Sequence, residues 1–275
     1  MANTNINPYG QGGSLPEGYP ISTSLDENNA QKAAAASTVY QLKRMINGGG
    51  SQWTGKKWYG FGTSITNTNN EGKYPTYLAQ LSGMTFVNKG HSGGTIVKNG
   101  NHAIYDDIMS QTSSTLADAD LITLEVGAND GAALGTIYDG LPGETVTDNS
   151  TLCGALNLCI RHLQEVSNAQ IVVICSPRGR YPNGSSSTPN YGNNKIAGLF
   201  TAAERDEIMR QVCMLNSVYY IPAGAMDGMG YARMNASNAY NVDNIHQTNL
   251  GGYNFAQAIW SQLKNIPLFY TAIPS

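Results

Sequence analysis

Ser64, Asp243 and His246 are the residues whose types and spacing suggest nucleophilic chemistry in this chain. Ser64 stands in the segment Gly62-Thr63-Ser64, directly after an apolar run. A serine hydroxyl is a weak nucleophile at its ordinary pKa and needs an adjacent base, most often a histidine. Asp243 precedes His246 by three residues, so its carboxylate can hold one ring nitrogen while the other accepts the serine proton. The pattern predicts Ser64 as nucleophile, His246 as general base and Asp243 as its support.

Each of these motifs also has a simpler interpretation when it stands alone. A glycine–any residue–serine turn after a strand is more often only a turn, and an isolated Asp-x-x-His segment is commonly a surface turn. Catalysis requires that the segments meet in space. Whether they meet depends on the strands and helices that carry these segments.

Apolar strand-like runs alternate with helical patterns beyond residue 56. Five runs predict strands, at 57–61, 84–88, 121–126, 171–174 and 218–221. Helical spacing of apolar residues predicts helices at 74–81, 104–116, 152–166, 201–215 and 249–263. This alternation predicts an α/β protein, a three-layer α/β/α sandwich around a flavodoxin-like parallel sheet of about five strands.

The carboxyl ends of parallel strands meet along one edge of a sheet, where α/β proteins bind their ligands. Four short polar turns are expected at this edge: Gly62-Thr63-Ser64, His91-Ser92-Gly93, Gly127-Ala128-Asn129-Asp130 and Asp243-Asn244-Ile245-His246. The sequence therefore predicts that the serine and the aspartate–histidine pair lie together.

Taken together, the four turns resemble the motifs of the SGNH hydrolases, also called GDSL hydrolases, a family of esterases and lipases. The resemblance runs in the family's order from Phe61 to His246 and covers most of the chain beyond residue 56. Gly62-Thr63-Ser64-Ile65 is similar to the nucleophile block, and Asp243 and His246 match the family's D-x-x-H pair. The resemblance implies the SGNH hydrolase fold and an esterase with a Ser-His-Asp catalytic triad.

The same resemblance implies an oxyanion hole. Residues 88–95 are similar to the second block, in which Gly93 matches the glycine that donates a backbone N–H. Gly127-Ala128-Asn129-Asp130 is similar to the G-x-N-D block, in which Asn129 matches the side-chain donor. The tetrahedral intermediate would then be stabilised by the N–H groups of Ser64 and Gly93 and by the Asn129 amide. Each such donor is typically worth about 2.7–4 kcal/mol of barrier.

One position departs from the family. Thr63 stands before the serine, where the family usually has an aspartate that supports the turn rather than reacting. Activity is expected to be retained, with a reorganised set of contacts around the turn and a lower rate as the open alternative.

Two other functions stay open at this level. Asp130, together with Asp118, Asp120 and Glu125, invites comparison with the paired carboxylates of glycosidases. However, Glu125 is expected inside a strand and no matching second acid is evident at another strand end. Asp130 is expected to stabilise its turn. The second alternative is a catalytically weak or inactive glycan-binding domain on the same scaffold. Hydrolysis by the wild type but not by Ser64→Ala would separate it from an esterase.

Composition limits the partners of the chain. Its 275 residues carry a formal net charge of −3, and no basic run is longer than Lys56-Lys57, which argues against binding nucleic acid. No apolar run reaches membrane-spanning length and residues 1–4 show no leader pattern, so we expect a soluble protein without a signal peptide, synthesised in the cytoplasm. The four cysteines form no C-x-x-C pair and are expected to be buried free thiols. Neither a metal nor a cofactor is expected, because the histidines show no ligand spacing.

The expected substrate is a short acyl ester, most simply an acetyl ester on a carbohydrate, as a small molecule or a polysaccharide. Polar surroundings and the lack of a long apolar lid segment favour this class. Four residues are candidate contacts to the substrate: His91, Arg178, Arg180 and Tyr181. The last three stand in an insertion after the fourth strand, where arginine and aromatic side chains suit polar oxygens and sugar rings. A loop without a role is the equal alternative for that insertion.

Residues 1–50 are expected to form a separate N-terminal arm, and residues 51–275 the hydrolase domain. The arm contains a helical pattern at 26–46, which ends at Gly48-Gly49-Gly50. Gly18-Tyr19-Pro20-Ile21 and the residues after it resemble connector segments of phage tail or fibre proteins. This resemblance implies association with a virion, deacetylation of a host glycan and a homo-oligomer, a trimer, formed through the helix.

Overall fold

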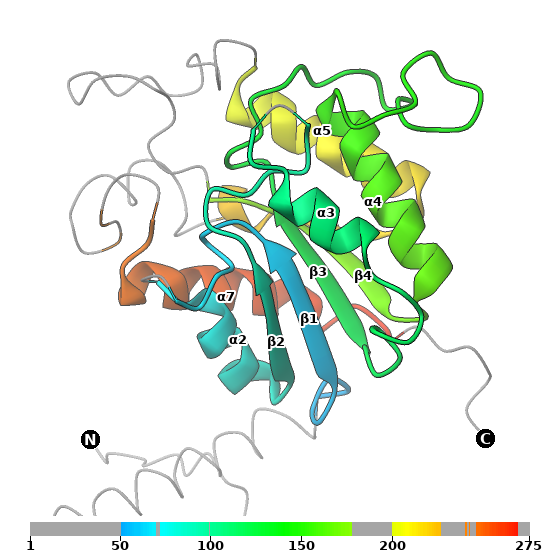
Figure 1. Cartoon of the computed structure of the whole chain (residues 1–275). Helices are drawn as coiled ribbons and strands as arrows, with labels where there is room; N and C mark the ends of the chain where they lie inside the picture. The colour runs from blue at the N-terminus through cyan, green and yellow to red at the C-terminus, as the bar shows by residue number, and fades with distance from the viewer. Residues whose placement is uncertain are drawn as a thin grey trace, which may run out of the picture. The chain divides into compact units, whose positions relative to one another are not determined.

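The computed structural model describes residues 51–69, 72–98, 100–177, 200–226, 240, 242 and 246–268. Predictions made for residues 1–50, for Asp243 and for the insertion with Arg178, Arg180 and Tyr181 lie outside this part of the chain. The described residues form a parallel sheet with helices on both faces, so the predicted α/β/α architecture is confirmed (Figure 1).

The sheet has five strands: β1 (Lys57–Gly62), β2 (Thr85–Gly90), β3 (Leu121–Val126), β4 (Gln170–Cys175) and β5 (Tyr219–Ile221). Their order is β2-β1-β3-β4-β5, and every neighbouring pair is parallel. This is the flavodoxin-like order that the sequence predicted. The winding direction reverses between β1 and β3, and the crevice at such a switch point is where α/β proteins bind ligands.

Helices form the two outer layers (Figure 1). On one face, α2 (Tyr74–Ser82) packs against α7 (Asn249–Leu263). The other face carries α3 (Ala103–Met109), α4 (Leu152–Val166) and α5 (Ala202–Leu215), and a short 3₁₀ helix, η1 (Ala223–Ala225), follows β5. None of these described helices is long and apolar enough to cross a membrane.

The pleat of the strands divides the apolar side chains between two cores. In β1, Trp58 belongs to the core beneath α2 and α7, whereas Tyr59 and Phe61 belong to the core beneath α3, α4 and α5. Both cores are continuous with the middle strands, which are buried along nearly their whole length. The sheet is therefore a rigid platform for the turns at its carboxyl edge.

One predicted helix is too long. The pattern at 104–116 predicted a helix of that length, but α3 ends at Met109. The residues that follow are mostly serines and threonines whose side chains bond to nearby backbone. The Thr112 N–H donates to Thr115 Oγ1 at 2.9 Å, and that hydroxyl donates to the Thr112 carbonyl oxygen at 3.0 Å. Such local bonds compete with helical ones and end the helix.

The cysteines behave as small apolar residues. All four are buried and free, as predicted: Cys153, Cys159, Cys175 and Cys213. Burial raises the pKa of the Cys153 thiol to about 12, so this side chain stays protonated at neutral pH.

Close backbone packing holds the start of α7 in place. Gly252 is buried in the first turn of α7, and a Cβ there would overlap the carbonyl oxygen of Gly72, just before α2. A Cβ at Gly251 would overlap the carbonyl oxygen of Tyr240. Because α7 follows His246 closely in the chain, this packing fixes the segment that carries His246.

Gly252→Ala should lower the free energy of unfolding by about 3 kcal/mol, because the added methyl group meets backbone rather than a flexible side chain. Urea denaturation followed by circular dichroism measures the change. Leu250→Ala is the control, since Leu250 is 48% exposed in the same helix and should alter stability by only about 0.5 kcal/mol. Equal stability of Gly252→Ala and the wild type would contradict the tight packing of α7.

Candidate active site

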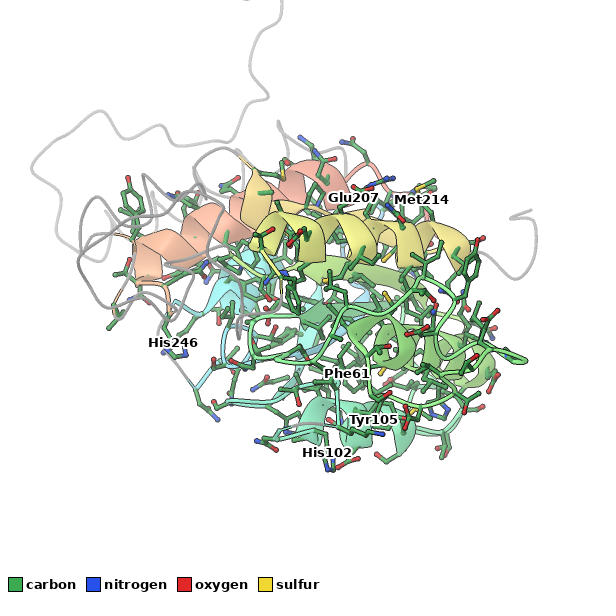
Figure 2. All side chains as sticks on the ribbon, turned by 90° about the horizontal axis from the view of Figure 1, so that it is seen from above. Phe61, His102, Tyr105, Glu207, Met214 and His246 are labelled. Carbon is green, nitrogen blue, oxygen red and sulfur yellow. The ribbon has the colours of Figure 1, made fainter. Side chains whose placement is uncertain are left out.

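Ser64 and His246 meet at the carboxyl edge of the sheet. Ser64 lies in the turn after β1, and His246 lies just before α7. The two residues are 182 positions apart in the chain, yet His246 Nε2 is 2.8 Å from Ser64 Oγ. Figure 2, which looks down on this edge, shows His246 beside the start of α7, well apart from Tyr105 of α3 and from His102, which precedes α3. With the ring proton on Nδ1, Nε2 can accept the Ser64 hydroxyl proton.

The turn that carries Ser64 runs from Thr63 to Asn67 and is called the serine turn below. The N–H groups of Thr66 and Asn67 both donate to the Thr63 carbonyl oxygen at 3.1 Å. The turn folds back so closely on β1 that a Cβ at Gly62 would overlap Thr66 Oγ1. Ser64 is only 7% exposed in this tight bend. The position of its hydroxyl is therefore set by the surrounding protein, with little contact to solvent.

Gly93 and Asn129 lie at the same edge, after β2 and β3. Gly93 is exposed and has a φ of +70°, a backbone conformation that favours glycine. Asn129 Nδ2 donates to the Gly94 carbonyl oxygen at 3.1 Å, which ties the turn after β3 to the loop after β2. An amide group has two hydrogens, so the second can be donated to a bound oxygen.

Asp130 also connects the turn after β3 to the loop after β2, through its side chain. Its buried carboxylate accepts the N–H groups of Ile96 and Val97 at 2.9 and 3.2 Å and that of Gly127 at 2.9 Å. Burial raises the pKa of the Asp130 carboxyl above its usual value, and the three N–H donors act in the opposite direction. Asp130 stabilises the turn, as expected from the sequence, and it fixes the backbone from which Asn129 projects.

Glu125 contacts the serine turn, a role that the sequence did not reveal. The residue lies in β3 and is fully buried. Its Oε2 accepts hydrogen bonds from Thr63 and Thr66, and its Oε1 contacts the Ser176 hydroxyl. Burial raises the pKa of the Glu125 carboxyl, and these donors oppose the rise. The available signal was a single acid in the apolar run Leu121–Val126, because a buried charge is costly unless it has partners.

Arg205 of α5 braces the ends of β3 and β4. Its guanidinium is fully buried and bonds to Asp206 Oδ1 at 2.8 Å through Nε and 2.6 Å through Nη2. It also donates to the carbonyl oxygens of Gly127 and Ser176 at 3.2 and 3.3 Å. In the sequence Arg205 stands among acidic residues of a helix and looks like part of an exposed face. Nothing in the sequence therefore indicated that it is buried near the site.

His91 is the one candidate for substrate contact that lies among the described residues. Its backbone N–H donates to the Gly62 carbonyl oxygen at 2.8 Å, which places it next to the serine turn. Its side chain is 36% exposed, and Nε2 is 3.0 Å from Asp107 Oδ2. Within the described part of the chain, no group of three His, Cys, Asp or Glu side chains is arranged to hold a metal ion.

Comparisons with known proteins identify the family and the fold of the chain. Residues 59–251 match the model of the GDSL-like lipase/acylhydrolase family. A solved protein from Lactobacillus plantarum is 23% identical, over 78% of this chain and 99% of its own, with a TM-score of 0.64. A protein from Chitinophaga pinensis described as a possible lipase is 20% identical, over 75% of this chain and 98% of its own, with a TM-score of 0.55. These two likenesses establish the fold; no curated protein matches the chain significantly.

Asp130→Asn should lower the free energy of unfolding by about 1–3 kcal/mol, because an amide group in this place sets an N–H donor against a backbone N–H. Urea denaturation measures the effect. Asp106→Asn is the control, since the Asp106 side chain is 61% exposed and should change stability by about 0.5 kcal/mol or less. An equal loss of stability in both variants would argue against a special role for Asp130.

Proposed function

Because the chain belongs to the GDSL-like lipase/acylhydrolase family, we propose that it is a serine esterase in which Ser64 is the nucleophile and His246 the general base. The observation that carries the proposal is the 2.8 Å separation between Ser64 Oγ and His246 Nε2. A base must lie within hydrogen-bond reach of the proton that it removes, and this pair meets that requirement. We assign the support of the His246 ring to Asp243.

In the first half of the reaction, Ser64 Oγ attacks the carbonyl carbon of the ester while its proton moves to His246 Nε2. The carbonyl oxygen becomes negatively charged in the tetrahedral intermediate. We assign its stabilisation to the backbone N–H groups of Ser64 and Gly93 and to the Asn129 amide. These donors are fixed by the turns before the substrate arrives, which is the condition under which such donors lower a barrier most.

Collapse of this intermediate breaks the bond between the carbonyl carbon and the alcohol oxygen, which takes the proton from His246. An acyl group then remains on Ser64. A water molecule attacks the acyl carbon and gives its proton to His246. The second intermediate releases the carboxylic acid, and the proton returns to Ser64 Oγ. Every proton that is transferred in these reaction steps passes through His246 Nε2.

For the substrate, we propose a short acyl group, most simply acetyl, on a carbohydrate. Polar side chains beside the serine turn support this class. Asn67 donates to Ser92 Oγ at 3.4 Å, and Asn88 donates to Asn67 Oδ1 at 3.3 Å and to Thr68 Oγ1 at 3.1 Å. Asn88 and Ser92 are exposed, Asn67 and Thr68 are partly exposed, and these amides and hydroxyls can exchange their mutual bonds for bonds to sugar hydroxyls.

Ser64→Ala should reduce kcat for p-nitrophenyl acetate by about 10³-fold or more, because the acyl-enzyme cannot form. Release of p-nitrophenol measures the rate. Ser110→Ala is the matched control, since Ser110 Oγ donates to the Asp107 carbonyl oxygen at an exposed position after α3. Equal rates for the wild type and Ser64→Ala would exclude Ser64 as the nucleophile and would favour a binding domain.

p-Nitrophenyl acetate should be hydrolysed with a kcat/KM about 10-fold above that of p-nitrophenyl octanoate, because a long chain gains little where its apolar surface stays in water. Release of acetate from an acetylated oligosaccharide should accompany this preference. Both substrates are compared below the concentration at which the octanoate forms micelles. A preference for octanoate would place the protein among lipases instead.

A further inference from the structure

The carboxylate of Glu125 holds the serine turn on both sides of Ser64. Before the serine, the Thr63 N–H and hydroxyl donate to Glu125 Oε2 at 3.0 and 2.7 Å. After the serine, the Thr66 hydroxyl donates to the same oxygen at 3.1 Å. The Tyr74 hydroxyl is 3.0 Å from Thr66 Oγ1 and can donate to it, which directs the Thr66 proton to Glu125. All of these groups are buried, so water does not compete for the bonds.

Thr63 passes this restraint on to the turn. Its hydroxyl oxygen accepts the Ile65 N–H at 3.2 Å, while its proton goes to Glu125. An ionised aspartate, which the family usually has at this position, has no proton to donate and would repel a second buried carboxylate. A threonine hydroxyl both donates and accepts, so it suits a turn that rests on a glutamate. Thr63 and Glu125 therefore form a matched pair.

We propose that Glu125 is a positioning residue of the active site. By fixing Thr63 and Thr66, it fixes Ser64 between them and keeps Ser64 Oγ within reach of His246. It acts on alignment and does not touch the reacting atoms. A misplacement of about 1 Å in such a group can cost about 10²-fold in rate. The inference rests on the proposed function for its kinetic test, but not for its structural test.

Ser176 completes the surroundings of Glu125 and allows a selective substitution. Its hydroxyl contacts Glu125 Oε1 and also lies 3.0 Å from the Val126 carbonyl oxygen. In Glu125→Gln, the amide oxygen can replace Oε2 and keep the bonds from Thr63 and Thr66. The amide NH₂ can then donate to Ser176, whose own proton goes to Val126. In Glu125→Leu, which has a similar volume, the same donors lose their acceptor.

The test compares Glu125→Leu, Glu125→Gln, Thr63→Val and Thr63→Ser with the wild type. We expect kcat for p-nitrophenyl acetate to fall by about 10- to 100-fold in Glu125→Leu and by about 10-fold in Thr63→Val, with KM little changed. Glu125→Gln and Thr63→Ser keep the hydrogen bonds and should stay within about threefold of the wild type. Amide hydrogen exchange at residues 63–67 should be faster in Glu125→Leu.

Thr123→Val is the matched control for a loss of stability alone. Thr123 is buried in the same strand and accepts the Trp58 Nε1–H at 2.8 Å, away from the serine turn. Its substitution should lower the urea midpoint and leave both kcat and the exchange at 63–67 unchanged. A fall in kcat in Thr123→Val equal to that in Glu125→Leu would mean that Glu125 acts only through stability, and would overturn the proposal.

Two further outcomes separate this inference from the proposed function. If the wild type hydrolyses the ester and folded Glu125→Leu matches its kcat, the inference is wrong and the esterase stands. If the wild type does not hydrolyse any ester, the proposed function fails, and hydrogen exchange decides on Glu125 alone: unchanged exchange at 63–67 overturns its positioning role. Should Glu125→Leu fail to fold, equal kcat values for Thr63→Val and Thr63→Ser would overturn it.

Discussion

The parallel register between β1 and β3 is the constraint on which the candidate site depends. It sets Gly62 opposite Glu125, one residue before the serine turn begins. Because Gly62 has no side chain, Thr66 can fold back against the strand and reach the carboxylate. A shift of one residue in this register would turn the Glu125 side chain to the other face of the sheet and leave Thr63 without its acceptor. The fold thus fixes Ser64 through a pairing within the sheet.

Buried polar groups also hold the other turns at the carboxyl edge of the sheet in fixed positions. Asn129 and Asp130 tie the turn after β3 to the loop after β2, and Arg205 ties it to the end of β4. A buried polar network gives a defined arrangement only when its members are satisfied, since each missing partner costs the desolvation of a group. Donors that are held this way need not reorganise when charge develops on a substrate, which is the physical basis of an oxyanion hole.

The sequence predicted the fold closely, because periodicity reports which face of each element is buried. The helices at 152–166 and 249–263 and the strand at 121–126 have the predicted bounds. The predicted end of α3 was wrong, because the bonds of serine and threonine side chains to the local backbone end the helix without changing the apolar pattern from which it was predicted. The candidate site was visible only where residue types repeat a known motif. Partners such as Thr63 with Glu125 depend on strand order and register, which no local pattern encodes.

The pair of Thr63 and Glu125 also bears on whether the departure from the family's aspartate signals lost catalysis. A buried carboxylate is costly, and a fold in which apolar residues replaced both the carboxylate and its donors would often be as stable or more stable. A domain that only binds glycans has no evident use for a charge beneath the serine turn. Here the carboxylate has donors from Thr63, Thr66 and Ser176, arranged around the residue that meets His246. The restraint that an aspartate supplies from within the turn is supplied from the neighbouring strand, which favours a working serine over an inactive scaffold.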